Sequence, residues 1–157
     1  MYIKRNRALF ISCLIICLGI MGSNSLAKAE MNVHLNIVNS YYIDLDGDNM
    51  EDDIVTRFKI KINIDDYNPI DQPYILYIQM MLPSGITYFY EFEVSQNPSP
   101  ISCIYFYNQA IESGYYTVSI TVVVPYEESN YLATSDSLVF DPPGGNGGIE
   151  PRARLLI

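Results

Sequence analysis

Apolar and polar residues alternate with a period of two along most of the chain after residue 30, and turn-forming residues separate the alternating runs. A sustained apolar pattern at helical spacing does not occur in this region. The alternation therefore predicts an all-β chain. The expected strands cover residues 32–43, 53–64, 74–82, 86–94, 101–107, 115–124 and 131–140.

The run DIVTRFKIKINI, residues 53–64, shows the alternation most clearly. One face of this strand would carry Ile54, Phe58, Ile60, Ile62 and Ile64, and the other Val55, Arg57, Lys59, Lys61 and Asn63. The pattern predicts one buried face and one solvated face. The largely apolar run 74–82 predicts a central strand, joined through the turn Pro83-Ser84-Gly85 to run 86–94 in a hairpin.

Seven short strands with turns between them are typical of a single immunoglobulin-like antiparallel β-sandwich. The segment SGYYTVSITV, residues 113–122, resembles the penultimate strand of fibronectin type III and polycystic-kidney-disease-type domains. This resemblance implies that Tyr116 is a corner tyrosine whose hydroxyl bonds the preceding backbone, which is a packing role. The Gly-Tyr corner and the segment SDSLVFDPPGG also look like those of uncharacterised archaeal or bacterial surface proteins.

Residues 1–29 have the charge, apolar core and small-residue order of a secretory signal peptide. Basic residues at positions 4, 5 and 7 precede an uncharged run over residues 8–22, and Ala27 and Ala29 fit the −3 and −1 positions of a cleavage site. The run is shorter than the roughly 20 residues that span a bilayer, so we favour cleavage over retention as an N-terminal anchor. A secreted or cell-surface location follows.

After Phe140 the composition changes abruptly to Pro and Gly in DPPGGNGG, so the β-sandwich domain is expected to cover residues 30–141. Residues 142–157 would then be a linker with a short tail. The tail, IEPRARLLI, is too short to fold alone. A docking peptide, an added edge strand and a disordered end are all compatible with it, and we favour disorder.

Without residues 1–29, five basic and eighteen acidic residues remain, which gives a net charge of −13. Such a charge repels nucleic acid and anionic lipid headgroups, so neither is an expected partner of the mature form, whereas divalent cations are attracted. Cys103 is the only cysteine left, so no intrachain disulfide can form, and its place in ISCIYFY predicts a small buried side chain.

The segment DLDGDNMEDD, residues 44–53, lies between the first two expected strands. Positions 1, 3, 5 and 9 of an EF-hand calcium loop correspond to Asp44, Asp46, Asp48 and Asp52, and the carbonyl at position 7 corresponds to Met50. In a tight turn, carboxylates two residues apart converge and share a hard cation. Gly47 and Asn49 are the residues best able to adopt the positive φ that such a turn requires.

Two departures exclude an EF-hand domain, since position 6 is Asn49 rather than Gly and position 12 is Val55 rather than Glu. The loop is similar to the Asp-rich calcium loops of the FG-GAP and VCBS families of extracellular proteins. That similarity implies side-chain ligands at Asp44, Asp46, Asp48 and Asp52, with Met50 binding through its carbonyl. Those families repeat the loop around a propeller, whereas it occurs once here, so only the local chemistry carries over.

We therefore expect a structural Ca²⁺ ion, bound with a dissociation constant of roughly 10⁻⁴ to 10⁻³ M. The alternative is a solvated acidic turn, for which Asp, Asn and Gly are ordinary residues.

A catalytic constellation is not evident. His34 is the only histidine, and no serine lies in a G-x-S-x-G motif. Glu91 and Glu93 are compatible with a paired-carboxylate hydrolase, but their alternation on one strand favours a wet face. The chain is predicted not to be an enzyme.

The expected function is that of a non-enzymatic β-sandwich with structural calcium, acting in adhesion, envelope structure or extracellular recognition of a protein or glycan. The alternative is a carbohydrate-binding accessory module that uses some of the fourteen tyrosines on its surface. The simpler account of the tyrosines is that aromatic residues suit strands.

Overall fold

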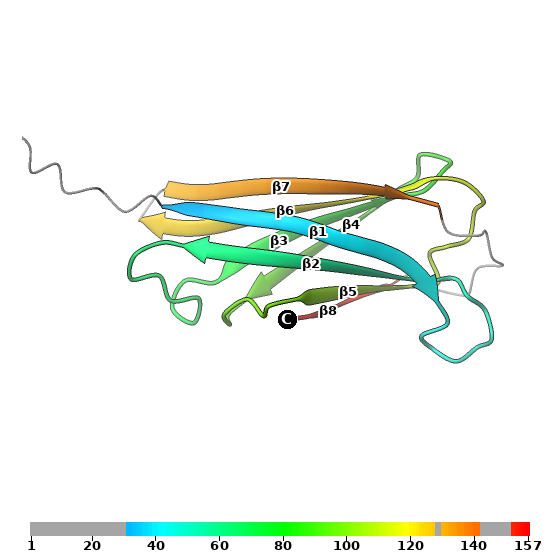
Figure 1. Ribbon diagram of the computed structural model, residues 1–157, viewed down its shortest axis with the longest axis horizontal. Helices are drawn as coiled ribbons and strands as arrows, with labels where there is room; N and C mark the ends of the chain where they lie inside the picture. The colour runs from blue at the N-terminus through cyan, green and yellow to red at the C-terminus, as the bar shows by residue number, and fades with distance from the viewer. Residues whose placement is uncertain (1–30, 128–129, 142–151) are drawn as a thin grey trace, which may run out of the picture.

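The computed structural model describes residues 31–127, 130–141 and 152–157, which form an all-β sandwich of two four-stranded antiparallel sheets (Figure 1). The strands are β1 (Asn32–Ile43), β2 (Asp53–Asn63), β3 (Tyr74–Met81), β4 (Thr87–Val94), β5 (Ser102–Tyr107), β6 (Tyr116–Glu127), β7 (Asn130–Phe140) and β8 (Arg152–Leu156). One sheet has the order β1-β2-β5-β8 and the other β4-β3-β6-β7. Over the described residues, no helix has the length and hydropathy needed to cross a bilayer. The predicted signal peptide and the Pro/Gly segment 142–151 lie outside the described residues.

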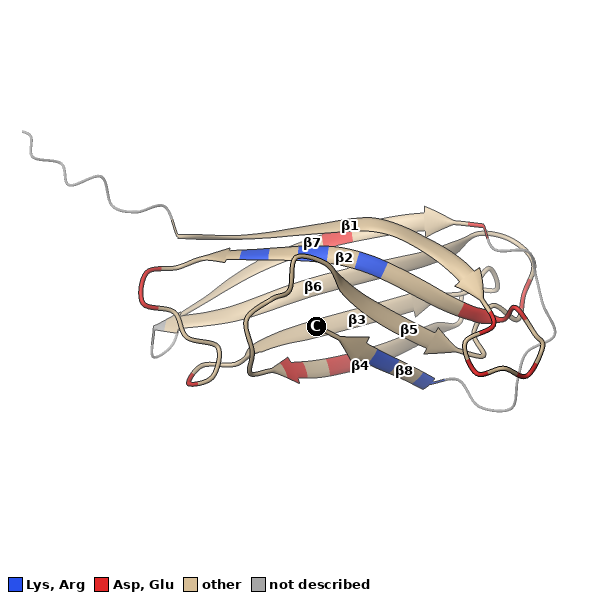
Figure 2. Cartoon of the chain, turned by 60° about the horizontal axis from the view of Figure 1, so that its bottom comes forward, with Lys and Arg blue, Asp and Glu red and all other residues tan. Residues whose placement is uncertain are grey.

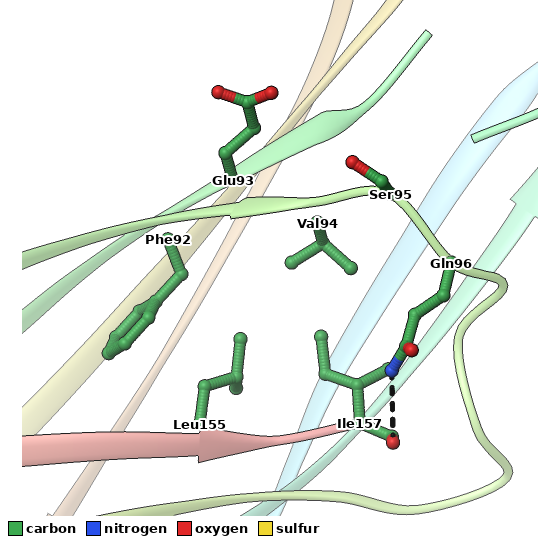
Figure 3. A pocket seen from close by; sticks show the side chains of 7 residues that line it. All are labelled: Phe92, Glu93, Val94, Ser95, Gln96, Leu155 and Ile157. Atoms are coloured by element: carbon green, nitrogen blue, oxygen red, sulfur yellow. Dashed lines mark hydrogen bonds between the residues drawn. The ribbon is translucent and has the colours of Figure 1, made fainter. Parts of the chain in front are cut away.

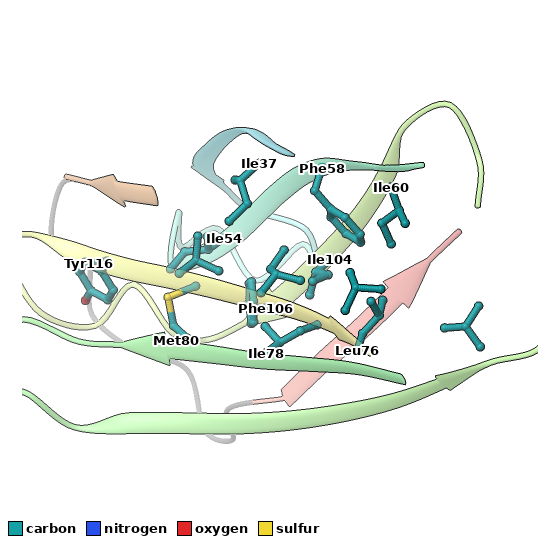
Figure 4. Close-up of a cluster of buried hydrophobic side chains, with 14 of the residues drawn as sticks. Ile37, Ile54, Phe58, Ile60, Leu76, Ile78, Met80, Ile104, Phe106 and Tyr116 are labelled. Atoms are coloured by element: carbon teal, nitrogen blue, oxygen red, sulfur yellow. The ribbon is translucent and has the colours of Figure 1, made fainter. Parts of the chain in front are cut away.

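The core lies between the sheets, where alternate residues of the central strands β2, β3, β5 and β6 face one another (Figure 4). Its fully buried members include Ile54, Phe58, Leu76, Ile78, Met80, Ile104, Phe106, Tyr116, Val118 and Ile120. Burial of each large apolar side chain contributes roughly 1.5–3 kcal/mol relative to exposure. The period-two pattern read from the sequence is thus the pattern that builds the core.

The predicted hairpin is formed by β3 and β4, which pair from Tyr74 with Val94 to Met81 with Thr87. Gly85 in its turn has φ 86°, a conformation that favours glycine. β3 also pairs with β6 along its other side, so it is central as predicted.

Two residues of the first sheet differ from their predicted environments. Val55, expected on the solvated face, is only 2% exposed, since Tyr41 and Tyr105 stand directly beside it on the neighbouring strands. Cys103, expected to be buried, is partly exposed because it lies on the outward face of β5, opposite Arg57. Burial in this sheet therefore depends on cross-strand neighbours as well as on alternation.

The tail contains an added edge strand in place of the disorder that its composition favoured, because β8 pairs antiparallel with β5 from Cys103 with Leu156 to Tyr107 with Arg152. The inward side chains of β8, Ala153 and Leu155, pack against the core. β5 alone would leave an unpaired hydrogen-bonding edge, and β8 covers it. The sandwich therefore has eight strands rather than about seven.

Tyr116, at the start of β6, makes the contacts expected of a corner tyrosine. Its fully buried hydroxyl accepts a hydrogen bond from the backbone N–H of Glu112 at 2.7 Å and donates to the carbonyl of Glu112 at 2.9 Å. Both bonds join the strand to the backbone four residues upstream. The corner between β5 and β6 is thereby held against the core.

At the β1–β7 edge of the sandwich a carboxylate bridges the two sheets. β1 has a bulge between Ile37 and Asn39, and the N–H of Ile37 donates to Asp136 Oδ2 of β7 at 2.7 Å. The Ile37 N–H thus has its acceptor on a strand of the other sheet. β1 and β7 lie side by side as a result (Figure 1).

Replacing Tyr116 by Phe keeps the ring in the core but removes both hydrogen bonds to Glu112. We expect the free energy of unfolding to fall by about 1–2 kcal/mol, measured by urea denaturation. Tyr115→Phe is the matched control, since Tyr115 is 69% exposed and its change should leave stability unaltered. Equal stability of the two variants would contradict the role of the corner.

Two tyrosines, Tyr67 and Tyr74, have pKa values above the usual value for tyrosine. Burial raises the pKa of Tyr67 to about 12, and burial followed by the proximity of Tyr67 also raises the pKa of Tyr74. Neither hydroxyl has a hydrogen-bond partner among the described residues. Both phenols therefore favour the neutral form in the folded state.

The pKa of Tyr67 is higher in the folded state than in the unfolded state, where it is near 10. This difference stabilises the fold below about pH 10, and the stabilisation is lost as the pH rises toward 12. We expect the free energy of unfolding to decrease between about pH 8 and pH 11. Tyr67→Phe should show a smaller decrease, because phenylalanine does not ionise. Urea denaturation at both pH values measures the effect, with Tyr131→Phe, an exposed position, as control. An unchanged decrease in Tyr67→Phe would refute the assignment.

Candidate metal site

The loop between β1 and β2 brings together three of the predicted ligands. One carboxylate oxygen from each of Asp44, Asp46 and Asp48 lies within 4.8 Å of the other two. Asp44 is partly exposed, and Asp46 and Asp48 are exposed. The spacing of two residues between them, read from the sequence, thus produces the predicted convergence.

The backbone of the loop adopts the two unusual conformations that were predicted. Gly47 has φ 79° and Asn49 has φ 68°. Asp44 accepts the N–H of Gly47 at 2.7 Å through Oδ1 and the N–H of Asn49 at 3.0 Å through Oδ2, and Asp48 Oδ1 accepts the N–H of Met50 at 2.8 Å. These bonds shape the loop around its own carboxylates.

Asp52, a further predicted ligand, is not among the carboxylates that converge. Asp52 is fully buried, and its backbone carbonyl accepts the N–H groups of Gln109 at 2.9 Å and Ala110 at 2.7 Å. It stands apart from the three exposed carboxylates because the chain has already entered the sandwich at this residue. Met50 remains in the loop with its side chain exposed, and metal binding by its carbonyl stays a prediction.

Asp53 is the residue of this region whose role the sequence analysis missed. It is fully buried at the first position of β2. Its Oδ2 accepts the N–H of Leu45 at 2.6 Å and that of Asp46 at 3.2 Å, and its Oδ1 accepts the N–H of Asn108 at 2.8 Å. Asp53 therefore fixes the loop to the end of β5. The sequence feature that could have indicated this role is the position of Asp53, a polar residue that starts a strand and precedes the apolar Ile54.

Without a bound cation, the converging carboxylates of Asp44, Asp46 and Asp48 repel one another. Two unit charges about 4 Å apart repel by roughly 1 kcal/mol in water and roughly 4 kcal/mol near a protein surface. The N–H groups bonded to Asp44 and Asp48 offset part of this repulsion. Carboxylate oxygens are the ligands that Ca²⁺ prefers, so the arrangement suits a hard divalent ion.

Other candidate groups do not converge in this way. His34 is exposed on β1, and Glu91 and Glu93 are exposed on the outward face of β4. A hollow of about 420 Å³ opens between the edges of β4 and β8 (Figure 3). Among its lining residues, Phe92 and Val94 point toward Leu155 and Ile157, while Glu93 points away.

Comparisons of the chain with models of protein families, with curated proteins and with solved structures give no significant match. The function is therefore argued from the contacts of the chain itself.

The contacts of Asp53 lead to a stability prediction. Asp53→Asn leaves one acceptor oxygen where the carboxylate accepted three N–H groups, so we expect a loss of about 2–3 kcal/mol in the free energy of unfolding. Urea denaturation in the presence of EGTA measures it without any metal contribution. Asp65→Asn, an exposed loop residue with the same charge change, is the control. A loss no larger than that of the control would exclude Asp53 as the anchor.

Proposed function

We propose that this protein is a non-enzymatic, secreted or surface-displayed β-sandwich whose β1–β2 loop binds a structural Ca²⁺ ion, serving adhesion, envelope structure or extracellular recognition. The observation that carries the proposal is the convergence of Asp44, Asp46 and Asp48 within 4.8 Å. The anchoring of the same loop by Asp53 supports it, because a loop fixed at its base loses less conformational entropy when an ion orders its tip. The order of residues 1–29 supports export.

An immunoglobulin-like relationship is part of this proposal. Two features support it, the first being strand order. Such sandwiches place their second and fifth strands, B and E, in one sheet and C, F and G in the other, and here β2 and β5 share one sheet while β3, β6 and β7 share the other. The second feature is the pair of hydrogen bonds between the Tyr116 hydroxyl and the backbone of Glu112 at the corner before the sixth strand.

Calcium should stabilise the protein by mass action, since the converged carboxylates exist only in the folded state. At about ten times the dissociation constant the gain is roughly 1.4 kcal/mol. Millimolar Ca²⁺ is therefore expected to raise the melting temperature above that in EGTA by a few degrees, measured by differential scanning calorimetry.

Matched variants make this test specific. Asp46→Asn with Asp48→Asn should abolish the calcium-dependent shift. Asp65→Asn with Asp66→Asn, the same charge change in the exposed loop after β2, should preserve it. A melting temperature that does not respond to millimolar Ca²⁺ in the unmodified protein would eliminate the metal site.

A second candidate function is sugar binding by surface tyrosines. Tyr41, Tyr105 and Tyr107 lie on the outward face of the β1-β2-β5-β8 sheet, and the first two flank the same residue, Val55. Rigid rings on the outward face of one sheet offer stacking positions for sugar rings. Binding of sugars that depends on these tyrosines would favour this candidate over a purely structural role.

A further inference from the structure

All five Lys and Arg residues of positions 30–157 lie on one face of one sheet. Arg57, Lys59 and Lys61 alternate along β2, and Arg152 and Arg154 alternate along β8 (Figure 2). The partners of these residues in the strand register place them all outward, opposite to the core-facing Phe58, Ile60 and Leu155. We call this surface the basic face.

The basic face has the dimensions of an extended binding surface. Tyr105 of β5 pairs with Val55 of β2 on one side and with Arg154 of β8 on the other, so Arg154 is level with Val55. Lys61 lies six residues further along β2. With Arg152 two residues in the other direction, the basic side chains extend over roughly 26 Å. Across the strands, β2 and β8 are separated only by β5 and are roughly 10 Å apart.

The positive charges of the basic face are not neutralised by acidic residues of the same sheet. All five side chains are exposed, and in residues 31–127, 130–141 and 152–157 none of them forms an ion pair. The four strands of the sheet contain a single acidic residue, Asp53, which is buried and bonded to the loop backbone. The red acidic residues of Figure 2 lie mostly at the two ends of the sandwich and on β4, and one further acidic residue, Asp136, lies on β7 in the other sheet.

Two tyrosines of β5 lie beside the arginines of β8, whereas the residue of β5 that pairs with Arg57 of β2 is Cys103. Tyr105 and Tyr107 of β5 are partly exposed on this face, and Tyr105 pairs directly with Arg154. The guanidinium of Arg152 lies 4.6 Å from the ring centre of Tyr107, a cation–π contact that orients it. Planar rings and guanidinium groups thus lie side by side along β5 and β8.

We propose that the basic face binds an extended acidic polysaccharide, with its carboxylate or sulfate groups paired to the five cations and its sugar rings stacked on the tyrosines. The proposal rests on the sugar-binding candidate above and names its polymer class. Guanidinium groups pair with carboxylate and sulfate oxygens through two parallel hydrogen bonds. The length of the face fits a polymer that lies along the strands.

The spacing of the cations selects among polyanions. Successive cations of β2 are about 6.6 Å apart, whereas duplex DNA carries one charge per about 1.7 Å of helix axis when both strands are counted. A chain with charges about a sugar ring apart matches this spacing and is repelled less by the acidic ends. Those ends act weakly on the face at physiological salt, because the screening length there is only about 8 Å.

Binding is tested with immobilised polygalacturonate, which carries carboxylates, and heparin, which carries sulfates, beside neutral dextran and duplex DNA. The purified protein is titrated in EGTA at about 50 mM NaCl and again at about 200 mM. We expect binding to both acidic polysaccharides, weaker at the higher salt, and no binding to dextran. EGTA removes the calcium site from the measurement, so failure of either proposal is seen separately.

Variants locate the surface. Arg152→Gln with Arg154→Gln should weaken binding by about tenfold or more, and the corresponding lysine pair should weaken it less, because it keeps the charge and loses the planar fork. Gln79→Glu with Ser137→Asp changes the net charge equally but lies on the outward face of the other sheet, and should leave affinity within about twofold. Melting temperatures establish that each variant is folded.

Three results would overturn the proposal. They are no binding to either acidic polysaccharide at low salt, equal weakening in the control pair, and binding of duplex DNA at least as tight as that of the polysaccharides. Binding of dextran alone would retain the sugar-binding candidate and reject the acidic polymer.

Discussion

Asp53 is buried at the point where the acidic loop enters the sandwich, and its carboxylate accepts N–H groups from the loop and from the segment after β5. The adjacent carbonyl of Asp52 accepts two more from that segment. A carboxylate is needed here because several backbone donors converge on one point that water does not reach. The geometry of the three exposed carboxylates depends on this junction, since it fixes the base of the loop from which they project.

Charge in this protein is segregated rather than mixed. Among the described residues, most acidic residues lie in loops at both ends and on β4, with Asp136 on β7 and the buried Asp53 on β2, and the cations occupy the outward face of β2 and β8. The negative net charge of the chain, −9, therefore determines the electric field far from the protein, whereas a partner that touches the basic face meets a positive surface. The proposed calcium site and the basic face would serve different partners at separate places on one scaffold.

Much of the architecture was accessible from the sequence because a strand with one buried face must alternate. The first seven strands were found near their predicted bounds, and the pairing of Tyr116 with the upstream backbone was implied by a ten-residue resemblance. Prediction was weaker where burial arises from neighbours across the sheet. Val55 is an example, since Tyr41 and Tyr105 cover it from strands distant in sequence.

The sequence by itself determined the β class, the core-facing positions and the turn at Gly47 and Asn49, because strand periodicity and φ preferences are local properties. Tertiary structure alone decided that Asp52 and Asp53 enter the interior while Asp44, Asp46 and Asp48 stay outside, although all five have the same side chain. It also decided that β8 pairs with β5, which places Arg152 and Arg154 on the face of Lys59 and Lys61. Such placements depend on which strands become neighbours, and strand neighbours are fixed by the packing of the whole core.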